Sequence, residues 1–429
     1  MRRIVVVCGI GLSLAIGLLA SSAPAADWPQ WRGPDRDGIS REKGLLADWD
    51  AAPPKFLWQL DGMGTGYASV SVVKGKLYTT GNTEKGQSLI CVDLGAKKID
   101  WSTPLTDGSP KHGYEGARCT PTIDGDRAYV VSSDGAITCL STKDGAVLWS
   151  RKFKEFGGKM MSGWGFSESP LIDGDRVLCT PGGENAMIVC LDKKSGGDIW
   201  RSAMPKIGDS GKDGAAYSSI IISNAAGVKQ YVQLVGRGVI GVRASDGEYL
   251  WGYNKVANGV ANIPTPIASG DFVFASTGYG TGSVLVKLSK DGQGIKAEEV
   301  YFLNADTFQN HHGGMILIGD HIYAGHAHNK GFPICVDLKS GEVVWGGKMR
   351  PPQGADGSAA VTAVDGKIIF RYQNGTLALI EAKPDGYKLL GTFKPAYQEK
   401  ESWAHPVVVD GKMYLREQNK LMVYDVKAS

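Results

Sequence analysis

The sequence has no strong charge of either sign and no run rich in Lys or Arg. Its 47 Lys and Arg residues nearly balance 44 Asp and Glu residues, which leaves a net charge of +3 at pH 7. A nucleic-acid partner, which a basic patch would indicate, is therefore not predicted. Segments with the period of an amphipathic helix are almost absent, which argues against helical folds. Glycine is abundant, at 59 of 429 residues, and this indicates many tight turns.

Long hydrophobic runs are missing from the sequence except at the amino end. Residues 4–20 are apolar, follow Arg2 and Arg3, and precede small residues at positions 24–26. This pattern is typical of a cleaved signal peptide, and the run is too short for a membrane span. Cys8 lies too early in the run for lipid attachment at the cleavage point, so no membrane anchor is expected. We predict a signal peptide over residues 1–26 and a periplasmic or secreted protein.

Two marks recur along the rest of the chain. The first is a hairpin turn between short apolar strands, as in TIDGDRAYVV and VVDGKMYLR, and it recurs every 43 to 53 residues. The glycines of these turns are Gly75, Gly125, Gly174, Gly227, Gly270, Gly319, Gly366 and Gly411. The second mark is a strand that ends in an aromatic residue, at Trp101, Trp149, Trp200, Trp251, Tyr301 and Trp345. Each unit therefore consists of four short strands, A to D, joined by Gly/Asp turns.

Four-stranded units at this period are the signature of a β-propeller, in which each unit is one blade. The last unit ends at Ser429 after three strands and lacks strand D. The segment at 54–60 contains Trp58, which lies 43 residues before Trp101, so it supplies the missing strand and leaves no open edge. The prediction is an all-β fold, an eight-bladed β-propeller over residues 54–429. Residues 27–53, with WPQWRGPDRDG, form a lead-in segment that is expected to pack on the surface.

These repeats resemble a known family. The pattern C-[LV]-D-x-K-x-G-x-x-x-W, with the upstream DGDR[AV], is similar to the PQQ-like repeat of quinoprotein alcohol dehydrogenases and of the BamB-like group of outer-membrane-protein assembly factors. The resemblance covers residues 54–429 and implies an eight-bladed propeller. The dehydrogenases imply pyrroloquinoline quinone (PQQ), calcium held by Glu, Asn and an acidic pair, and a disulfide between adjacent cysteines. The chain contains no Cys-Cys dipeptide. The BamB-like group implies an envelope protein as partner.

The cysteines and tryptophans are expected to be architectural. Four cysteines each precede the tryptophan of their blade by ten residues, so they occupy one strand position in four different blades: Cys91, Cys139, Cys190 and Cys335. Equivalent positions in separate blades lie too far apart for a disulfide, which indicates buried free thiols. Cys119 and Cys179 lie on other strands, and a bond between them is the alternative. One tryptophan per blade at constant spacing indicates packing between neighbouring blades.

Polar and aromatic residues concentrate on one face of the predicted ring. In a propeller, the loops that enter strand A and the loops that join B to C surround the same mouth of the channel. Concave, aromatic-lined mouths are common ligand sites. The predicted ligand-binding residues of this mouth are His112, Tyr114, Glu115, Arg118, Trp164, Glu168, Tyr217, Asn262, Asn310, His311, His312, Trp403 and His405.

Five of the seven histidines fall within residues 311–328. His321 is assigned to a turn on the opposite face, and the other four face the mouth. A metal site would use His326 and His328 on one loop, together with His311 or His312. Contact with an organic or peptide ligand is one alternative, and no specific role is another.

The sequence therefore supports three functions. The first is an exported, non-catalytic binding or scaffold module, a monomer that holds an envelope protein or peptide at its mouth. The second is a dehydrogenase with PQQ and calcium, in which Glu115 or Glu168 is among the calcium ligands and Trp164 stacks on the quinone. The third is a metal-dependent enzyme that uses the four mouth-facing histidines.

Overall fold

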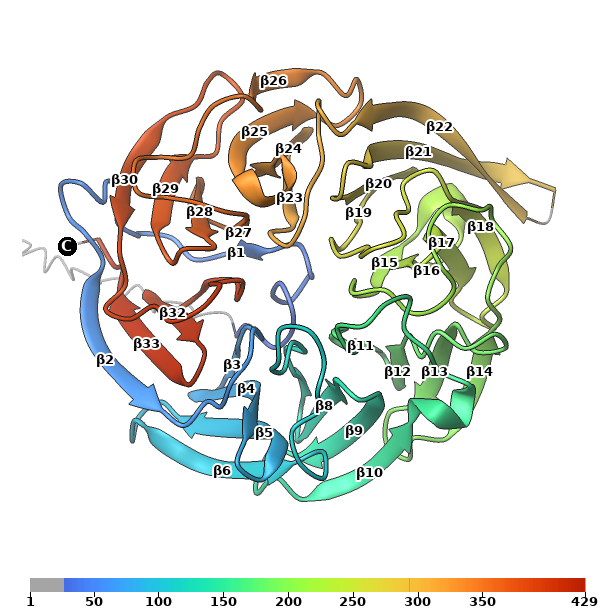
Figure 1. The fold of residues 1–429 in the computed structure, drawn as a ribbon, viewed down its shortest axis with the longest axis horizontal. Helices are drawn as coiled ribbons and strands as arrows, with labels where there is room; N and C mark the ends of the chain where they lie inside the picture. Colours follow the sequence, from blue (N-terminus) through green and yellow to red (C-terminus); the bar gives the residue numbers. More distant parts are fainter. Residues whose placement is uncertain (1–26, 293, 429) are drawn as a thin grey trace, which may run out of the picture.

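The computed structural model describes residues 27–292 and 294–428, and within them the strands form eight sheets arranged as a ring (Figure 1). This confirms the predicted all-β, eight-bladed propeller. The predicted signal peptide over residues 1–26 lies outside the described residues. In the part of the chain that is described, no helix is long and apolar enough to cross a membrane.

The first four blades each contain four antiparallel strands in chain order. Blade 1 contains β3 (Ser71–Val73), β4 (Lys76–Thr83), β5 (Gly86–Asp93) and β6 (Lys98–Pro104). Blade 2 contains β7 (Thr122–Asp124), β8 (Arg127–Ser132), β9 (Ala136–Ser141) and β10 (Val147–Lys152), followed by the short helix η1 (Phe153–Phe156). Blade 3 contains β11 (Leu171–Asp173), β12 (Arg176–Cys179), β13 (Ile188–Asp192) and β14 (Asp198–Ser202). Blade 4 contains β15 (Ile221–Ser223), η2 (Ala225–Gly227), β16 (Gln230–Val235), β17 (Gly238–Arg243) and β18 (Tyr249–Tyr253).

The last four blades complete the ring. Blade 5 contains β19 (Ile267–Ser269), β20 (Phe272–Thr277), β21 (Gly282–Asp291) and β22 (Gly294–Asn304). Blade 6 contains β23 (Met315–Ile318), β24 (His321–His326), η3 (His328–Lys330), β25 (Phe332–Asp337) and β26 (Val343–Gly346). Blade 7 contains β27 (Ala359–Val364), β28 (Lys367–Tyr372), β29 (Leu377–Glu381), β30 (Leu389–Phe393) and the added strand β1 (Ile39–Ser40). Blade 8 contains β31 (Val407–Val409), β32 (Lys412–Glu417), β33 (Lys420–Asp425) and β2 (Lys55–Asp61).

Blade 8 closes the ring as predicted from the missing fourth strand. Strand β2 pairs antiparallel with β33, and Trp58 lies opposite Val423. Because the first and last parts of the chain share one sheet, β33 has a paired strand on both sides.

The repeated turns and aromatic residues have the predicted architectural roles. In the first A–B turn, Lys74 and Gly75 both have positive φ, 48° and 75°, as a type I′ hairpin turn requires. The indole N–H of Trp101 donates to the carbonyl of Thr142 in the next blade over 3.3 Å. Tyr301 replaces tryptophan in this role, because its hydroxyl donates to the carbonyl of Leu338 in the next blade over 2.6 Å. Trp149 and Trp345 make the same kind of bond to the next blade, whereas the indole of Trp251 bonds Gln230 within its own blade.

The six cysteines of the described chain are free and buried, which confirms the register argument for Cys91, Cys139, Cys190 and Cys335 and excludes the alternative of a bond between Cys119 and Cys179. Cys91 and Cys139 lie directly opposite Trp101 and Trp149 on the neighbouring strands. Burial raises the pKa of the Cys91 thiol to about 12, so it is an uncharged apolar group at neutral pH.

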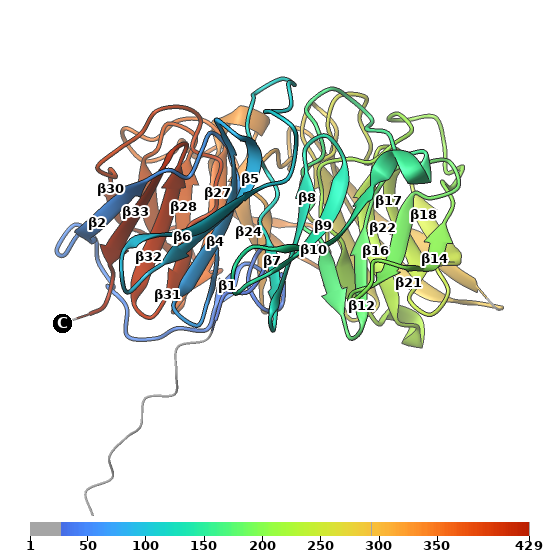
Figure 2. The same ribbon diagram turned by 90° about the horizontal axis from the view of Figure 1, so that it is seen from below.

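The lead-in segment does not pack on the outer surface as expected. Figure 2 shows it along the lower face of the ring, and in Figure 1 it crosses the centre of the ring. Trp28 and Arg32 are only 4% and 5% exposed, and Trp28 exchanges backbone hydrogen bonds with Val72 of blade 1. Strand β1 then pairs parallel with β27 as a fifth strand of blade 7. A segment with this much buried surface is part of the propeller core and blocks one end of its channel.

Candidate functional site

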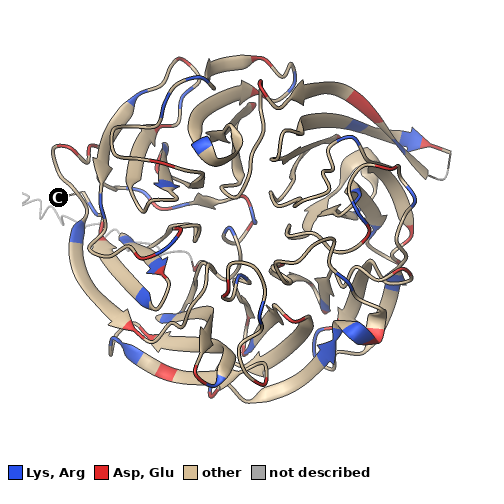
Figure 3. Cartoon of the chain, viewed as in Figure 1, with Lys and Arg blue, Asp and Glu red and all other residues tan. Residues whose placement is uncertain are grey.

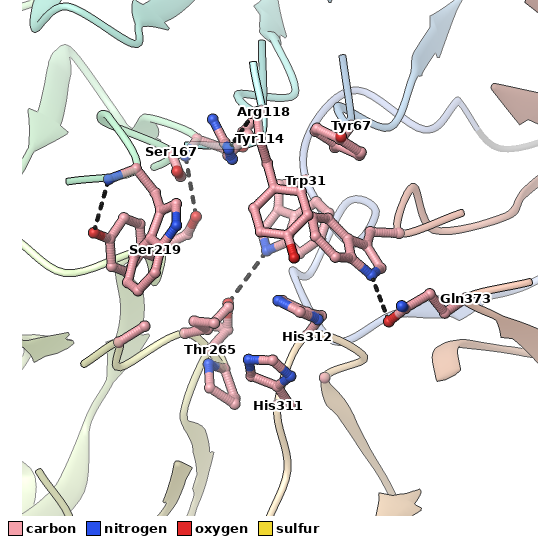
Figure 4. Close-up of a pocket in the computed structure, with 18 of the residues that line it drawn as sticks. Trp31, Tyr67, Tyr114, Arg118, Ser167, Ser219, Thr265, His311, His312 and Gln373 are labelled. Atoms are coloured by element: carbon pink, nitrogen blue, oxygen red, sulfur yellow. Dashed lines mark hydrogen bonds between the residues drawn. The ribbon is translucent and has the colours of Figure 1, made fainter. Parts of the chain in front are cut away.

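The loops of the upper face surround a pocket of about 250 Å³ at the mouth of the channel (Figure 4). The pocket is lined by residues of the loops that enter strand A and of the B–C loops, as the sequence predicted for this face. Ten aromatic or imidazole rings line it: Trp31, Tyr67, Tyr114, Trp164, Tyr217, Tyr279, His311, His312, His328 and Trp403. A ring-lined cavity of this size accommodates a side chain or a small ligand rather than a folded element.

Seven of the thirteen predicted ligand-binding residues line this pocket, and His328 from the predicted metal set also lines it. The seven are Tyr114, Arg118, Trp164, Tyr217, His311, His312 and Trp403. They come from the entry loops of five different blades, so the convergence of these distant segments depends on closure of the ring.

Four other predicted residues support the loops instead of lining the pocket. The Asn262 amide donates to the carbonyl of Val235 over 3.0 Å, and the Asn310 amide donates to the carbonyl of Gly325 over 2.9 Å. His405 Nδ1 lies 3.1 Å from the carbonyl of Val361. His112 contacts Ser133 and Arg118 through its two ring nitrogens, which lie 3.1 and 3.2 Å from their partners. These side chains hold the entry loops against the blades.

The two predicted carboxylates do not line the pocket either. Glu168 is 3% exposed and points into blade 3, where it accepts hydrogen bonds from the Thr180 hydroxyl over 2.9 Å and the Gln233 amide over 3.0 Å. Burial raises the pKa of Glu168 to about 8, although the bonds from Thr180 and the charge of Arg36 act in the opposite direction. Glu115 is exposed and is not among the lining residues.

The lead-in segment supplies the floor of the pocket, which the sequence did not predict. Figure 4 shows Trp31 in the middle of the site, and its indole N–H donates to Thr265 Oγ1 over 3.2 Å. The Trp31 ring also meets the His405 ring edge to face, with the ring centroids 4.7 Å apart. Arg32 lies beside it and donates to the carbonyls of Met315 and Asp37. The sequence WPQWRGPDRDG is dense in tryptophan and arginine, but this composition does not reveal where the lead-in segment packs.

Three histidines form a stack on one wall. The centroid of the His311 ring lies 3.5 Å from that of His312 and 3.9 Å from that of His328. The His312 ring continues the stack onto Trp403 at 4.2 Å. Burial lowers the pKa of His311 to about 3, and the neighbouring His328 adds to this effect. Burial also lowers the pKa values of His312 and His328, so the three rings are neutral at pH 7.

The predicted metal set of His311, His312, His326 and His328 is not assembled. Within residues 27–292 and 294–428, no three or more His, Cys, Asp or Glu side chains are grouped so that they could hold a metal ion. His326 accepts the backbone N–H of Gln309 over 3.1 Å and does not line the pocket. Among the other three, the His311 ring stacks on that of His328 and is tilted against that of His312.

The pocket is cationic. Among the described residues that line it, Arg32 and Arg118 are the charged ones and no Asp or Glu is present. Arg118 donates to the loop carbonyls of Gly113 and Tyr114 over 2.8 and 2.6 Å, so backbone oxygens rather than a carboxylate hold it. Burial lowers the pKa of both guanidinium groups to about 10, so both remain charged at neutral pH. Figure 3 shows that both signs of charge are interspersed elsewhere along the ring.

The residues that line the pocket do not fit a calcium ion bound together with PQQ. Calcium takes six to eight oxygen ligands, usually with carboxylates among them. The described lining residues contain no carboxylate and no cysteine, and Glu168 is hydrogen-bonded inside blade 3. Trp164 does line the pocket, but it packs edge to face on Tyr217, with the ring centroids 5.8 Å apart.

Comparisons with solved structures show the fold. BamB from Moraxella catarrhalis has a TM-score of 0.58 and 12% identity, over 88% of this chain and 98% of that chain. Quinohemoprotein alcohol dehydrogenase from Comamonas testosteroni has a TM-score of 0.63 and 13% identity, over 96% of this chain and 82% of that chain. A europium-containing methanol dehydrogenase has a TM-score of 0.62 and 12% identity, over 91% and 89%. At such low identity these similarities show the fold alone.

Sequence comparison identifies the family. No curated protein sequence matches the chain. The family model described as outer membrane protein assembly factor BamB matches residues 42–155 and 112–347, more than half of the chain. The chain therefore belongs to this BamB-like family of PQQ-like repeat propellers.

Proposed function

We propose that this protein is an exported, non-catalytic binding module of the cell envelope, which holds a segment of a partner protein or a peptide in its mouth pocket. The observation that carries the proposal is the shape of the site: ten rings surround a cavity whose lower end is closed by Trp31 and Arg32. A closed, ring-lined cavity suits a protruding side chain or chain end.

The chemistry of the pocket supports binding rather than catalysis. The described lining residues offer no carboxylate to pair with the imidazoles as acid and base, and the three stacked histidines, of which His311 is buried and the other two half-buried, are neutral. General acid–base catalysis needs a group whose pKa lies near the working pH. The pKa of His311 is lowered to about 3, well outside that range.

The cellular setting rests on the family and on the amino-terminal sequence. BamB-like membership supports an envelope location and an envelope protein as partner. The apolar run at 4–20, with small residues at 24–26, supports export through a cleaved signal peptide. We propose that the mature protein is a monomer that begins near Asp27.

A pull-down from envelope extract tests the function. Purified protein would be compared with Trp164→Ala and Trp403→Ala, two changes in the pocket wall, and with Tyr249→Ala, which removes an aromatic side chain 40% exposed on blade 4. Recovery of a specific partner should fall about tenfold or more with the pocket variants and stay unchanged with Tyr249→Ala. Undiminished recovery with both pocket variants would remove the mouth from the proposal.

A further inference from the structure

We propose that the pocket selects a carboxylate that stands next to an aromatic side chain on the partner polypeptide, and that Arg32 of the lead-in segment is the group that recognises the carboxylate. This inference rests on the proposed binding function and adds the chemical class of the bound segment. It also assigns a binding role to a segment outside the repeats.

The environment of Arg32 is the first observation. Its side chain lines the floor of the pocket although the residue is only 5% exposed, and its Nη1 has no hydrogen-bond partner among the described residues. Nη1 lies under Gly314, where an added Cβ would stand 2.5 Å from it. The left-handed backbone of Gly314, with φ of 69°, and its missing side chain therefore leave room for the guanidinium.

The absence of a counter-ion is the second observation. None of the ion pairs of the described residues includes Arg32 or Arg118, whereas the buried Arg371 is paired with Glu417. The buried Arg36 and Arg416 also lack an ion pair, but their guanidinium groups bond to backbone carbonyls and neither residue lines the mouth pocket. A buried charge is costly unless it is paired, and the free Nη1 of Arg32 can donate charge-assisted hydrogen bonds to a carboxylate. The pocket thus contains two cations that have no carboxylate partner among the described residues, and a carboxylate on a bound polypeptide would supply one.

The aromatic lining of the pocket indicates which group stands beside the bound carboxylate. Trp31, Trp164 and Trp403 line the pocket together with four tyrosines and three neutral histidines, and the indole N–H groups of Trp31 and Trp403 are already bonded to Thr265 and Gln373. These indoles therefore present carbon surface rather than donors. Aromatic rings pack well on such surface in edge-to-face or offset arrangements. A cavity of about 250 Å³ holds one such ring and a carboxylate rather than a longer segment.

The same chemistry can come from two sources on a polypeptide: the terminal carboxylate of an aromatic residue, or the side chain of an Asp or Glu beside an aromatic residue. Three probes separate them. N-acetyltryptophan carries a terminal carboxylate, N-acetyltryptophanamide carries none, and N-acetylaspartyltryptophanamide carries a side-chain carboxylate. Isothermal titration would measure the dissociation constant of each probe at pH 7 and low salt.

Arg36 provides the matched control. It belongs to the same segment and is similarly buried, at 6% exposed, but it donates to the carbonyls of Ser169 and Pro170 and does not line the mouth pocket. Arg32→Gln should abolish the preference for acid over amide. Arg36→Gln should leave the preference intact. Arg32→Lys, which keeps the charge, should retain part of the preference.

We expect at least one acid probe to bind roughly tenfold or more tightly than the amide, because hydrogen bonds to charged groups exceed those between neutral groups. Equal binding of acids and amide would overturn the carboxylate assignment while leaving the binding function intact. An equal loss of preference in Arg32→Gln and Arg36→Gln would overturn the role of Arg32. If no probe binds although partner capture depends on Trp164, the ligand class is wrong. If capture is also independent of Trp164, the proposed function fails as well.

Discussion

The indole N–H of Trp31 donates a hydrogen bond to Thr265 Oγ1 over 3.2 Å, which joins the lead-in segment to the entry loop of blade 5. Trp31 also packs on the ring of His405 from the entry loop of blade 8, with the ring centroids 4.7 Å apart. The lead-in segment thus contacts opposite parts of the ring at once. The channel is closed at this level, and the mouth pocket has a floor.

Replacement of Trp31 should open that floor. Trp31→Ala should lower the free energy of unfolding by about 2–4 kcal/mol, because a large, partly buried ring is lost, and should weaken binding in the mouth pocket. Thr265→Val removes only the acceptor oxygen, and its cost should be nearer 1 kcal/mol. Urea unfolding and probe titration would measure both effects. Wild-type affinity in Trp31→Ala would contradict the role of the floor.

Glu168 should make stability depend on pH. Its pKa in the folded protein is raised to about 8 from an ordinary value of 4.5, so the folded state retains a proton that the unfolded state releases. The resulting stabilisation is fully present below about pH 4.5 and is lost as the pH rises toward 8. Glu168→Gln should abolish this decline and gain on the order of a few kcal/mol relative to wild type at pH 8.

Urea unfolding of the wild type and Glu168→Gln at pH 5, 6.5 and 8 would check this expectation. Glu155→Gln is a suitable control, because Glu155 is an exposed carboxylate whose pKa is lowered, chiefly by a hydrogen bond from Arg151, so its stabilising effect is already complete at pH 5. If wild type and Glu168→Gln change in parallel between pH 5 and 8, Glu168 is not the source of the pH dependence.

The architecture was predictable because it repeats. The glycine turns and terminal aromatics recur eight and six times, so each blade reinforces the assignment of the others, and even Tyr301 could be recognised as the replacement for a tryptophan. The constant spacing between Cys91 and Trp101 fixed their cross-strand register and therefore the free thiol. Ring closure by β2 followed from the count of strands.

The sequence predicted on which face of the ring the site lies, but not which side chains line it. An entry loop has no two-residue alternation, so the sequence does not say which side chain turns inward: Trp164 lines the pocket while Glu168, four residues later, points into blade 3. The lead-in segment has no repeat to align it, and its location depends on contacts such as those of Arg36 with Ser169 and Pro170 in blade 3. Clustering of imidazoles in sequence likewise did not reveal that they stack.

The buried histidines should make the protein sensitive to acid. Burial, aided by the nearby Arg32, lowers the pKa of His405 to about 3, so the unfolded state binds a proton that the folded state excludes. The stabilisation is present above the unfolded value, 6.5, and is lost as the pH falls toward 3. His405→Gln should reduce the decline in unfolding free energy between pH 7 and 4 by roughly 1–3 kcal/mol.

Denaturant unfolding at pH 7, 5.5 and 4 would measure that decline. His321→Gln is the matched control, since His321 is a partly exposed histidine at the turn between β23 and β24 on the opposite face. An acid response that His321→Gln reduces as much as His405→Gln would show that burial at the channel is not the cause.

The buried pair of Arg371 and Glu417 should be the most sensitive ion pair of the ring closure. Their side chains are 0% and 1% exposed, and Nη2 of Arg371 lies 2.7 Å from Oε2 of Glu417. The pair joins blade 7 to blade 8, and Glu417 also accepts a hydrogen bond from the hydroxyl of Ser402 over 2.6 Å.

Arg371→Met should lower the free energy of unfolding by about 3–5 kcal/mol, because it leaves a carboxylate buried without its cation. The double variant Arg371→Met/Glu417→Gln should recover part of this loss. The pair of Lys420 and Asp61, whose side chains are 20% and 60% exposed, joins β33 to the closing strand β2 and provides the control; Lys420→Met should cost about 1 kcal/mol or less. Urea unfolding of the four proteins would give these values, and a loss in Lys420→Met as large as that in Arg371→Met would show that burial does not set the cost.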